Sequence, residues 1–411
     1  MAAGLSAEAN RFERHRYLVG FCIGVAFLLF SDAAAGLGLH LYRRKLLWAR
    51  QTEERHYRQR NGVYHHDLAP NVSVDQAAWG PFIYPLRTNS EGFKDRVVST
   101  IDRRQRVDRV LFMGDSFTEG VGIAYDSTFV GRLAAVAARH SVEIANGAVA
   151  SYSPLLYWRK TIDIIDRRKL DVGEEVVFID ISDIEDEVNY FVDSAGVIQT
   201  HYSFGFFGDQ RAAPGKSAPH PWTAVWAENS LFVVATFERL RHAFDAPVVE
   251  RPSCPESLDD GAIWCRGGWT NSDSIMRQYG SEGLHNAQLH MSELAAFLRA
   301  RKIPLTVVVY PWPEQLRWND RQSLQVRTWS AWAQREHVGF VELFGDFFRA
   351  ADSASTRAVI DRDFMKGDVH WSAAGHRSVA LDFRKAYCSR QHADAAPTVL
   401  ARGICLSDSL P

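Results

Sequence analysis

A serine directly after a predicted strand has the clearest potential for chemistry in this sequence. Ser116 lies in Gly114-Asp115-Ser116-Phe117-Thr118-Glu119-Gly120, which follows the hydrophobic run from Val110 to Met113. Gly114 allows a sharp turn, and backbone N–H groups after Ser116 can face negative charge if they begin a helix. A serine in this position can attack an ester. Alternatively, these residues form an ordinary turn in which Asp115 or Ser116 caps the following helix.

The partners that such a serine needs occur near the other end of the chain. Asp368 and His370 lie in Gly367-Asp368-Val369-His370-Trp371, immediately before a predicted helix. In an extended segment, side chains at i and i+2 project to the same side, so Asp368 can accept a hydrogen bond from one ring nitrogen of His370 while the other faces Ser116. The imidazole would take the hydroxyl proton and return it to the leaving group. Alternatively, Asp368 caps the helix that starts near Ser372, and His370 is a partly buried polar residue.

Together, the two segments resemble the SGNH (GDSL-type) hydrolases, which are esterases, lipases, deacetylases and some O-acyltransferases. The resemblance covers roughly Arg109 to Cys388 with one long insertion, and it includes Asn146-Gly147 after the strand-like stretch from Val142 to Ala145. It implies an α/β fold, a three-layer α/β/α sandwich around a parallel sheet, with the serine after the first strand. It also implies an oxyanion hole formed by the backbone N–H groups of Ser116 and Gly147.

Two features differ from the common pattern of that family. The Asp-x-His-Trp form of Asp368 to Trp371 is similar to the branch that contains alginate O-acetyltransferases and related periplasmic polysaccharide-modifying proteins. In the third block, normally Gly-x-Asn-Asp, Ser182 stands in place of the asparagine that donates to the oxyanion. A hydroxyl can donate with a shorter reach, whereas loss of such a donor costs roughly 3 kcal/mol of transition-state stabilisation. A structural role in loop hydrogen bonding explains Asp180 and Asp183 at least as well as catalysis.

Two tryptophans, and the lack of cofactor and metal motifs, narrow the classes of substrate and cofactor that we expect. Trp312 and Trp371 could stack on sugar rings, because aromatic faces suit the C–H surface of a pyranose; alternatively, both pack at the bases of loops. No Gly-rich phosphate loop indicates a nucleotide cofactor, and no cysteine spacing indicates a metal site. We therefore expect an acyl ester or glycan as substrate, no cofactor, no metal, and polysaccharide biosynthesis or export proteins as candidate partners.

An apolar segment from Tyr17 to Leu41 predicts a membrane anchor, because about 20 such residues cross a bilayer. Asp32 lies nearer its C-terminal edge, where a carboxylate costs less than the roughly 3 kcal/mol expected at the bilayer centre. A cleavable signal peptide is the alternative, since Arg14 and Arg16 precede the apolar stretch and Ala33-Ala34-Ala35 fits a small-x-small cleavage site. We expect the uncleaved anchor.

Charge and cysteine usage point to different sides of the membrane. Positive residues flank the apolar segment on both sides, with more of them after it, which favours a cytoplasmic domain. Two cysteine pairs that each close a short loop, Cys254 with Cys265 and Cys388 with Cys405, favour an oxidising compartment. Large domains translocate largely regardless of flanking charge. With the family resemblance, we expect a single-pass protein of the cytoplasmic membrane whose catalytic domain lies in a periplasm-like space.

Strand and helix patterns alternate along the chain, which predicts a parallel sheet with ligands at the carboxyl ends of its strands. Ser116, Gly147 and Ser182 all fall at such ends. The predicted strands are 109–113, 142–145, 175–182, 305–310 and 339–343, and the predicted helices are 128–139, 154–168, 283–301, 323–336 and 373–387.

The 411 residues allow one large α/β domain with an insertion, or two domains. A net charge of −2 gives no electrostatic case for nucleic acid binding. We expect the insertion to shape the substrate cleft. The predicted segments are a cytoplasmic segment 1–16, a transmembrane anchor 17–41, a stalk and linker 42–100, a catalytic domain 101–388 with its insertion at 188–282, and an irregular tail 389–411.

These patterns together predict a membrane-anchored serine esterase or O-acetyltransferase that acts on acyl esters of a glycan through Ser116, His370 and Asp368. A lipase or lysophospholipase is the nearest alternative, favoured if the insertion presents an exposed apolar groove. A catalytically weak glycan-binding or assembly component of an export complex is the alternative of another class, and the altered block at Ser182 supports it.

Overall fold

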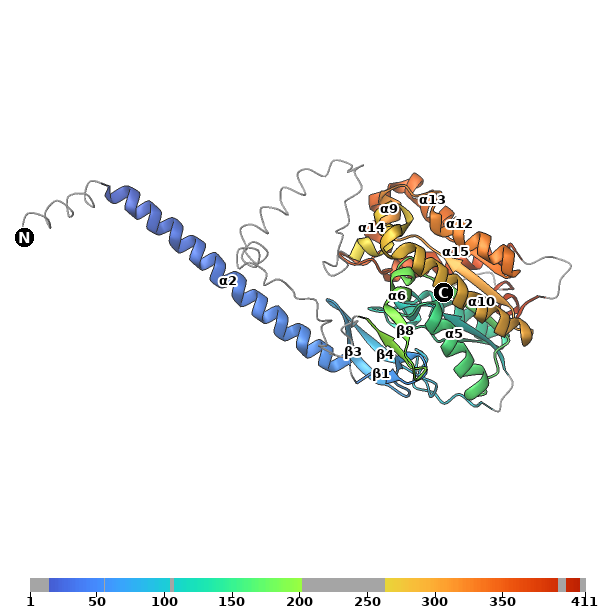
Figure 1. Cartoon of the computed structure of the whole chain (residues 1–411). Coiled ribbons are helices and arrows are strands. Elements are labelled where there is room, and N and C mark those ends of the chain that lie inside the picture. Colours follow the sequence, from blue (N-terminus) through green and yellow to red (C-terminus); the bar gives the residue numbers. More distant parts are fainter. Residues whose placement is uncertain (1–14, 55, 104–106, 202–262, 391–396, 407–411) are drawn as a thin grey trace, which may run out of the picture. The chain divides into compact units, whose positions relative to one another are not determined.

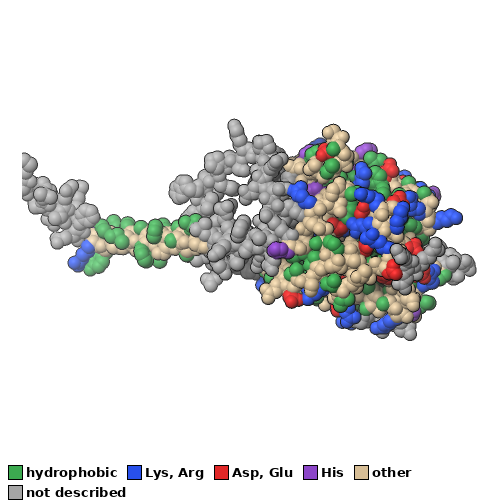
Figure 2. All heavy atoms as spheres, turned by 90° about the horizontal axis from the view of Figure 1, so that it is seen from below, with side chains coloured by type: hydrophobic (Ala, Val, Ile, Leu, Met, Phe, Trp, Pro, Cys, Tyr) green, Lys and Arg blue, Asp and Glu red, His purple; other side chains and the backbone are tan. Residues whose placement is uncertain are grey.

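The computed structural model describes residues 15–54, 56–103, 107–201, 263–390 and 397–406 (Figure 1). The chain divides near Thr52 into two units, an N-terminal helix and an α/β body. The helix is α2 (Arg16–Glu54), and its part Arg16–Gly38 is long and apolar enough to cross a membrane. Hydrophobic side chains cover the described part of this helix (Figure 2). The predicted anchor and the first part of the predicted stalk are therefore one continuous helix.

A five-stranded parallel sheet forms the centre of the α/β body, in the order β11-β10-β7-β5-β6. Its inner strands are runs of buried hydrophobic residues, which is typical of a parallel sheet covered on both faces. All five strands agree with the predicted ones within a few residues. Their bounds are β5 (Asp108–Met113), β6 (Val142–Asn146), β7 (Glu174–Ile179), β10 (Leu305–Val309) and β11 (Gly339–Glu342).

The helices between these strands cover both faces of the sheet. The connection through α4 (Phe129–Ala137) runs from β5 to β6, whereas the connection through α5 (Pro154–Ile162) returns past β5 to β7. Because parallel crossovers are right-handed, this reversal places the later helices on the other face. Accordingly, α10 (Ser281–Ala300) packs against α5 and α12 (Leu324–Glu336), while α15 (Ala373–Cys388) packs against α4. The predicted three-layer α/β/α sandwich is confirmed.

The reversal also locates the place where a ligand would bind. In open α/β sheets, a crevice forms outside the carboxyl ends of two adjacent strands whose connections leave in opposite directions. Here those strands are β5 and β7. Ser116 follows β5, and Ser182 follows β7.

The segment predicted as a linker is instead a folded part of the α/β body. Strand β1 (Arg58–Asn61) pairs antiparallel with β2 (His65–Leu68), and β3 (Ser73–Trp79) pairs antiparallel with β4 (Phe82–Arg87). The sequence did not indicate these strands, because charged, polar and turn residues interrupt their hydrophobic alternation. Aromatic side chains from this segment nevertheless join the main core, namely Tyr57, Tyr64 and Phe93.

The remaining elements lie in the second half of the α/β body, on either side of the insertion in sequence and towards the C-terminus. Residues 202–262 of the predicted insertion, with Cys254, lie outside the described residues, and so does the side chain of its predicted partner Cys265. Disulfide Cys388–Cys405 is confirmed, and the tail that was expected to be irregular contains a helix with buried Leu400 and Ile404. The helices and strands not yet named are α6 (Asp183–Asn189), β8 (Tyr190–Val192), β9 (Ile198–Thr200), α9 (Asp273–Ile275), α11 (Pro313–Arg317), α13 (Phe344–Ala354), α14 (Thr356–Asp363) and α16 (Val399–Ile404).

Candidate active site

The turn after β5 presents Ser116 at the start of a one-turn helix, α3 (Ser116–Glu119). Asp115 caps this helix, because its Oδ1 accepts a hydrogen bond of 2.9 Å from the backbone N–H of Phe117. A Cβ atom at Gly114 would lie 2.3 Å from Thr118 Oγ1 and 3.1 Å from the carbonyl oxygen of Phe178. Only glycine therefore fits the turn that places the serine at the crevice.

Ser116, His370 and Asp368 form one chain of hydrogen bonds, although 254 positions separate the serine from the histidine. Nε2 of His370 lies 2.7 Å from Ser116 Oγ, and Nδ1 lies 2.5 Å from Asp368 Oδ1. The backbone N–H of His370 also donates to Asp368 Oδ1 at 3.0 Å. A single tautomer satisfies all of these contacts, with hydrogen on Nδ1 and the serine hydroxyl donating to Nε2. The structure thus brings together the three side chains that the sequence selected as a candidate triad.

Asp368 is held at both carboxylate oxygens. Its Oδ2 accepts a hydrogen bond of 3.1 Å from the indole N–H of Trp79, at the end of β3. Burial acts to raise the pKa of Asp368, but the hydrogen bonds and charge of His370, with the bond from Trp79, outweigh it and lower the pKa to about 2. The carboxylate of Asp368 therefore stays ionised well below neutral pH. Trp79 was missed in the sequence because it lies in the predicted linker, with no local signal for its partner.

A buried ion pair fixes the helix that carries Ser116 to the N-terminal strands. Arg58 of β1 donates two hydrogen bonds to Glu119, at 2.9 and 2.7 Å, and both side chains are almost fully buried. Glu119 also accepts from the backbone N–H of Ala150 at 2.7 Å. Burial acts to raise the pKa of Glu119, but the charge and hydrogen bonds of Arg58 outweigh it and lower the pKa. The N-terminal strands therefore help to position the nucleophile.

Three buried carboxylates lie beneath the serine. One oxygen from each of Asp115, Asp180 and Asp183 lies within 4.8 Å of the others, a spacing that a cation could bridge. Burial and the nearby charges raise the pKa of both Asp115 and Asp183 well above the usual value. Burial and the neighbouring negative charges therefore favour the protonated forms of Asp115 and Asp183. The hydroxyl of Ser116 can also donate to Asp115 Oδ2, 3.1 Å away, as the alternative to its hydrogen bond with His370 Nε2.

The predicted oxyanion hole is only partly present. The backbone N–H of Gly147 donates to the carbonyl oxygen of Phe112 at 2.9 Å, so it continues the sheet and is not available to an oxyanion. The hydroxyl of Ser182 donates to Asp180 Oδ1 at 2.6 Å. The prediction that Gly147 and Ser182 donate to the oxyanion is therefore wrong, because both groups already donate within the fold. The backbone N–H of Ser116 has no acceptor within the described part of the chain, which leaves it available for this role.

Neither tryptophan that was predicted to bind sugar is accessible. Trp371 is 0% exposed and Trp312 is 2% exposed. Both pack against Phe117, and the indole N–H of Trp312 donates to Asp180 Oδ2 at 2.6 Å. Stacking on a pyranose needs an exposed ring face, so this prediction was wrong and the alternative of packing residues is correct.

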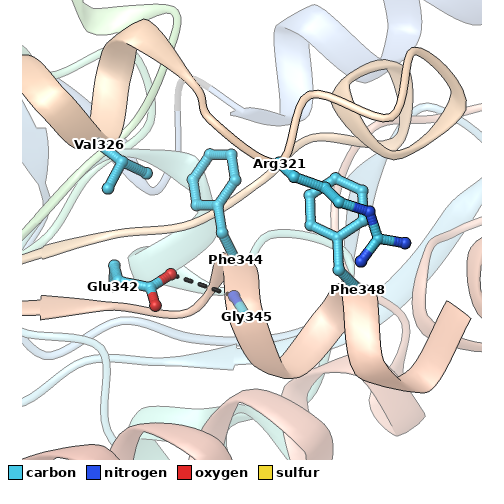
Figure 3. Close-up of a pocket in the computed structure, with 6 residues that line it drawn as sticks. All are labelled: Arg321, Val326, Glu342, Phe344, Gly345 and Phe348. Carbon is cyan, nitrogen blue, oxygen red and sulfur yellow. Dashed lines mark hydrogen bonds between the residues drawn. The ribbon is translucent and has the colours of Figure 1, made fainter. Parts of the chain in front are cut away.

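Other hollows of the body lie away from the triad. One cavity, of about 230 Å³, is lined by residues of α12, β11 and α13. Figure 3 shows this pocket, in which Arg321 lies over the ring of Phe348. A second hollow of about 380 Å³ lies along β6 and the segment from Asn89 to Asp102. Neither is lined by Ser116, His370 or Asp368.

Comparison with solved structures finds similarity to esterases and lipolytic proteins. A putative lipolytic protein of the G-D-S-L family from Desulfitobacterium hafniense is 12% identical over 68% of this chain and 99% of its own, with a TM-score of 0.34. The acetylxylan esterase Axe2 from Geobacillus stearothermophilus is 15% identical over 68% of this chain and 93% of its own, with a TM-score of 0.36. TesA is 10% identical over 68% of this chain and 97% of its own, with a TM-score of 0.34.

These TM-scores lie below 0.5, so the fold assignment rests on the sheet order and crossovers of this chain. No protein-family model matches the sequence, and the comparison with curated proteins likewise finds no match.

Proposed function

We propose that this chain is a membrane-anchored serine esterase or O-acyltransferase that acts on acyl esters of a glycan. The observation that carries the proposal is the hydrogen-bond chain from Ser116 Oγ through the His370 ring to Asp368. A hydroxyl, a general base and an orienting carboxylate in this order are the parts that acyl transfer needs. The crevice between the ends of β5 and β7 supports the same reading, since ligands of open α/β sheets bind there.

The proposed reaction uses each of these groups in turn. His370 Nε2 takes the proton as Ser116 Oγ attacks the acyl carbon, and Asp368 stabilises the imidazolium that forms. The Ser116 backbone N–H faces the developing oxyanion. His370 then gives the proton to the alcohol oxygen as its bond to the acyl carbon breaks. Water or a sugar hydroxyl next takes the acyl group from Ser116, which yields hydrolysis or transfer.

The proposed location is the outer side of the cytoplasmic membrane. The apolar stretch of α2 would anchor the chain, and the disulfide between Cys388 and Cys405 suits an oxidising compartment. Acetyl esters of a cell-envelope or secreted glycan are the proposed substrates, and polysaccharide biosynthesis or export proteins are the proposed partners.

A second candidate function follows from the incomplete oxyanion hole. The engagement of Gly147 N–H and of the Ser182 hydroxyl within the fold favours a catalytically weak glycan-binding or assembly protein. In that case the hydrogen bonds among Ser116, His370 and Asp368 would stabilise the fold and would not serve catalysis.

One experiment separates the two candidates. Purified full-length protein in detergent is assayed on p-nitrophenyl acetate and on an acetylated glycan, beside Ser116→Ala. The enzyme proposal predicts that the variant loses at least about a thousandfold in rate. Equal residual rates for wild type and variant contradict the enzyme proposal and support the glycan-binding or assembly protein instead. Deacetylation of p-nitrophenyl acetate without any reaction of the glycan would contradict the glycan substrate.

A further inference from the structure

The hollow of about 380 Å³ lies along one edge of the central sheet, and the triad does not line it. Strand β6 ends the sheet on this side: it pairs with β5, and beyond it a bridge joins Asn146 to Lys94. The hollow is lined by β6, by α4 and the turn before it, and by the segment from Asn89 to Asp102. Its volume falls within the range of small-molecule sites, about 300–1,000 Å³.

The hydroxyl of Tyr125 has no hydrogen-bond partner among the described residues, although this side chain lines the hollow and is only 9% exposed. Its ring lies against α4, since a Cβ atom at Gly131 would be 3.2 Å from Tyr125 Cδ1. A buried hydroxyl without a partner is costly, because it has lost its hydrogen bonds to water. This O–H group therefore needs a polar partner inside the hollow.

Three carboxylates that line the same hollow act on the Tyr125 hydroxyl, namely those of Asp95, Asp126 and Glu143. Burial raises the pKa of Tyr125, and these three negative charges raise it further. The phenol therefore keeps its hydrogen and can donate it, whereas the carboxylate oxygens accept. A ligand that suits this hollow accepts from the phenol and donates to carboxylates.

Ion pairs offset much of the negative charge. Arg109 Nε lies 2.8 Å from Glu143, and Arg96 Nε lies 3.3 Å from Asp126. An ammonium ligand has no acceptor for the phenol, and an anion is repelled by the carboxylates. A neutral ligand that carries hydroxyl groups meets both requirements, because each hydroxyl donates and accepts.

The part of the hollow formed by α4 is apolar. Ala134 and Ala135 of α4 line it, together with Ala138 just after the helix. Small methyl groups leave room for a ring and can contact its C–H atoms, while the hydroxyl groups of that ring reach the polar side chains. Apolar walls with a few polar groups are typical of small-molecule sites.

We propose that this hollow binds one or two sugar units of a saccharide, away from Ser116. The inference rests on the proposed function, because the sugar would belong to the glycan whose acyl esters react at the triad. Tyr125 donates to an oxygen of the sugar, and Asp95 and Glu143 accept from its hydroxyl groups. No covalent bond changes in this hollow, which holds the polymer while another of its units reaches the serine.

Titration with disaccharides tests the proposal. Full-length protein in phospholipid nanodiscs, which contain no sugar detergent, is titrated with cellobiose, maltose and N,N′-diacetylchitobiose, and binding is followed by saturation-transfer NMR. At least one of the three should bind. Tyr125→Phe should weaken that binding about fivefold through the loss of one hydrogen bond, with an unchanged thermal midpoint. Ala135→Phe, at an exposed position of α4, fills the hollow and should abolish binding.

Matched controls keep the outcomes distinct. Ala331→Phe places the same ring at an exposed position of α12, outside the hollow, and should bind as wild type does. If either hollow variant does not fold, the other still decides. Binding of none of the three disaccharides, or equal affinities of wild type and the hollow variants, overturns the inference. Failure of the proposed function appears separately, as equal rates of wild type and Ser116→Ala on p-nitrophenyl acetate.

Discussion

The indole N–H of Trp79 donates to Asp368 Oδ2 across 289 positions of sequence. The other oxygen of the same carboxylate accepts from the ring and the backbone N–H of His370. Asp368 is therefore fixed from two sides, and the residue that completes this arrangement comes from the segment between α2 and the sheet. The N-terminal strands are in this sense part of the proposed active site.

Replacement of Ser182 by alanine should leave the reaction almost unchanged. The hydroxyl of Ser182 donates to Asp180, so its removal should alter kcat/KM on p-nitrophenyl acetate by less than about threefold. An oxyanion donor would instead cost about a hundredfold to a thousandfold. A loss of that size, with an unchanged thermal midpoint, would show that Ser182 turns toward the oxyanion during the reaction.

Removal of the Arg58 charge should destabilise the body strongly. In Arg58→Met, Glu119 remains buried without its counter-charge, which costs about 3 kcal/mol or more of unfolding free energy. Denaturant unfolding of the purified protein measures this cost. Arg402→Met, which breaks an exposed pair with Asp108, is the matched control and should cost less than about 1 kcal/mol. Similar values for the two variants would contradict the role assigned to the buried pair.

Glu175 should make the protein less stable as the pH rises. Burial raises the pKa of this glutamate to about 8, against a hydrogen bond of 2.8 Å from Thr161 that acts to lower it. The folded state thus binds the proton more tightly than the unfolded state, so stability from this group is complete below about pH 4.5 and is lost as the pH rises to about 8. Glu175→Gln should be more stable than wild type at pH 8 by about 4 kcal/mol, because the pKa rises from 4.5 to about 8 and each unit corresponds to about 1.4 kcal/mol, and the gain should vanish near pH 4.

The measurement for Glu175 is denaturant unfolding at several pH values. Glu293→Gln, at an exposed position of α10, should follow the wild-type pH dependence. A difference between Glu175→Gln and wild type that does not change with pH would mean that Glu175 is ionised in the folded protein.

The disulfide between Cys388 and Cys405 should contribute to stability. It closes a loop of 17 residues, for which the loss of unfolded-state entropy corresponds to about 3 kcal/mol. Reduction, or Cys405→Ser, should lower the free energy of unfolding by about that amount. Cys22→Ser, at the free and exposed cysteine of α2, is the control. An unchanged unfolding midpoint after reduction would contradict this prediction.

The sequence predicted those parts of the site that depend on local patterns. Short hydrophobic runs followed by turn residues placed Ser116 and Ser182 at strand ends, and the i and i+2 spacing paired Asp368 with His370. These signals lie within a few residues of one another, and the alternating order of strands and helices fixed the parallel sheet. Local pattern was therefore sufficient for the parallel sheet and for the candidate triad, whereas the three-layer arrangement was expected from the family resemblance.

The parts that were missed or wrong depend on where distant segments pack. The partner of Trp79 is 289 positions away, and no periodicity indicates it. Whether Gly147 N–H is free depends on the register of β6 beside β5, where it pairs with Phe112. Trp312 and Trp371 could be interpreted as sugar-binding or core residues, because a tryptophan near a strand end can be exposed or buried. Only the packing around Phe117 shows that both are buried.

Covalent labelling of Ser116 tests the central claim most directly. A fluorophosphonate forms a stable bond only with a serine hydroxyl that a neighbouring base has activated. Intact-mass and peptide analysis of the labelled protein should place one adduct on Ser116, with none in Ser116→Ala and with labelling at least about a hundredfold slower in His370→Ala. No adduct on wild-type protein, or an adduct of equal rate in His370→Ala, would contradict the account of Ser116 as a nucleophile activated by His370.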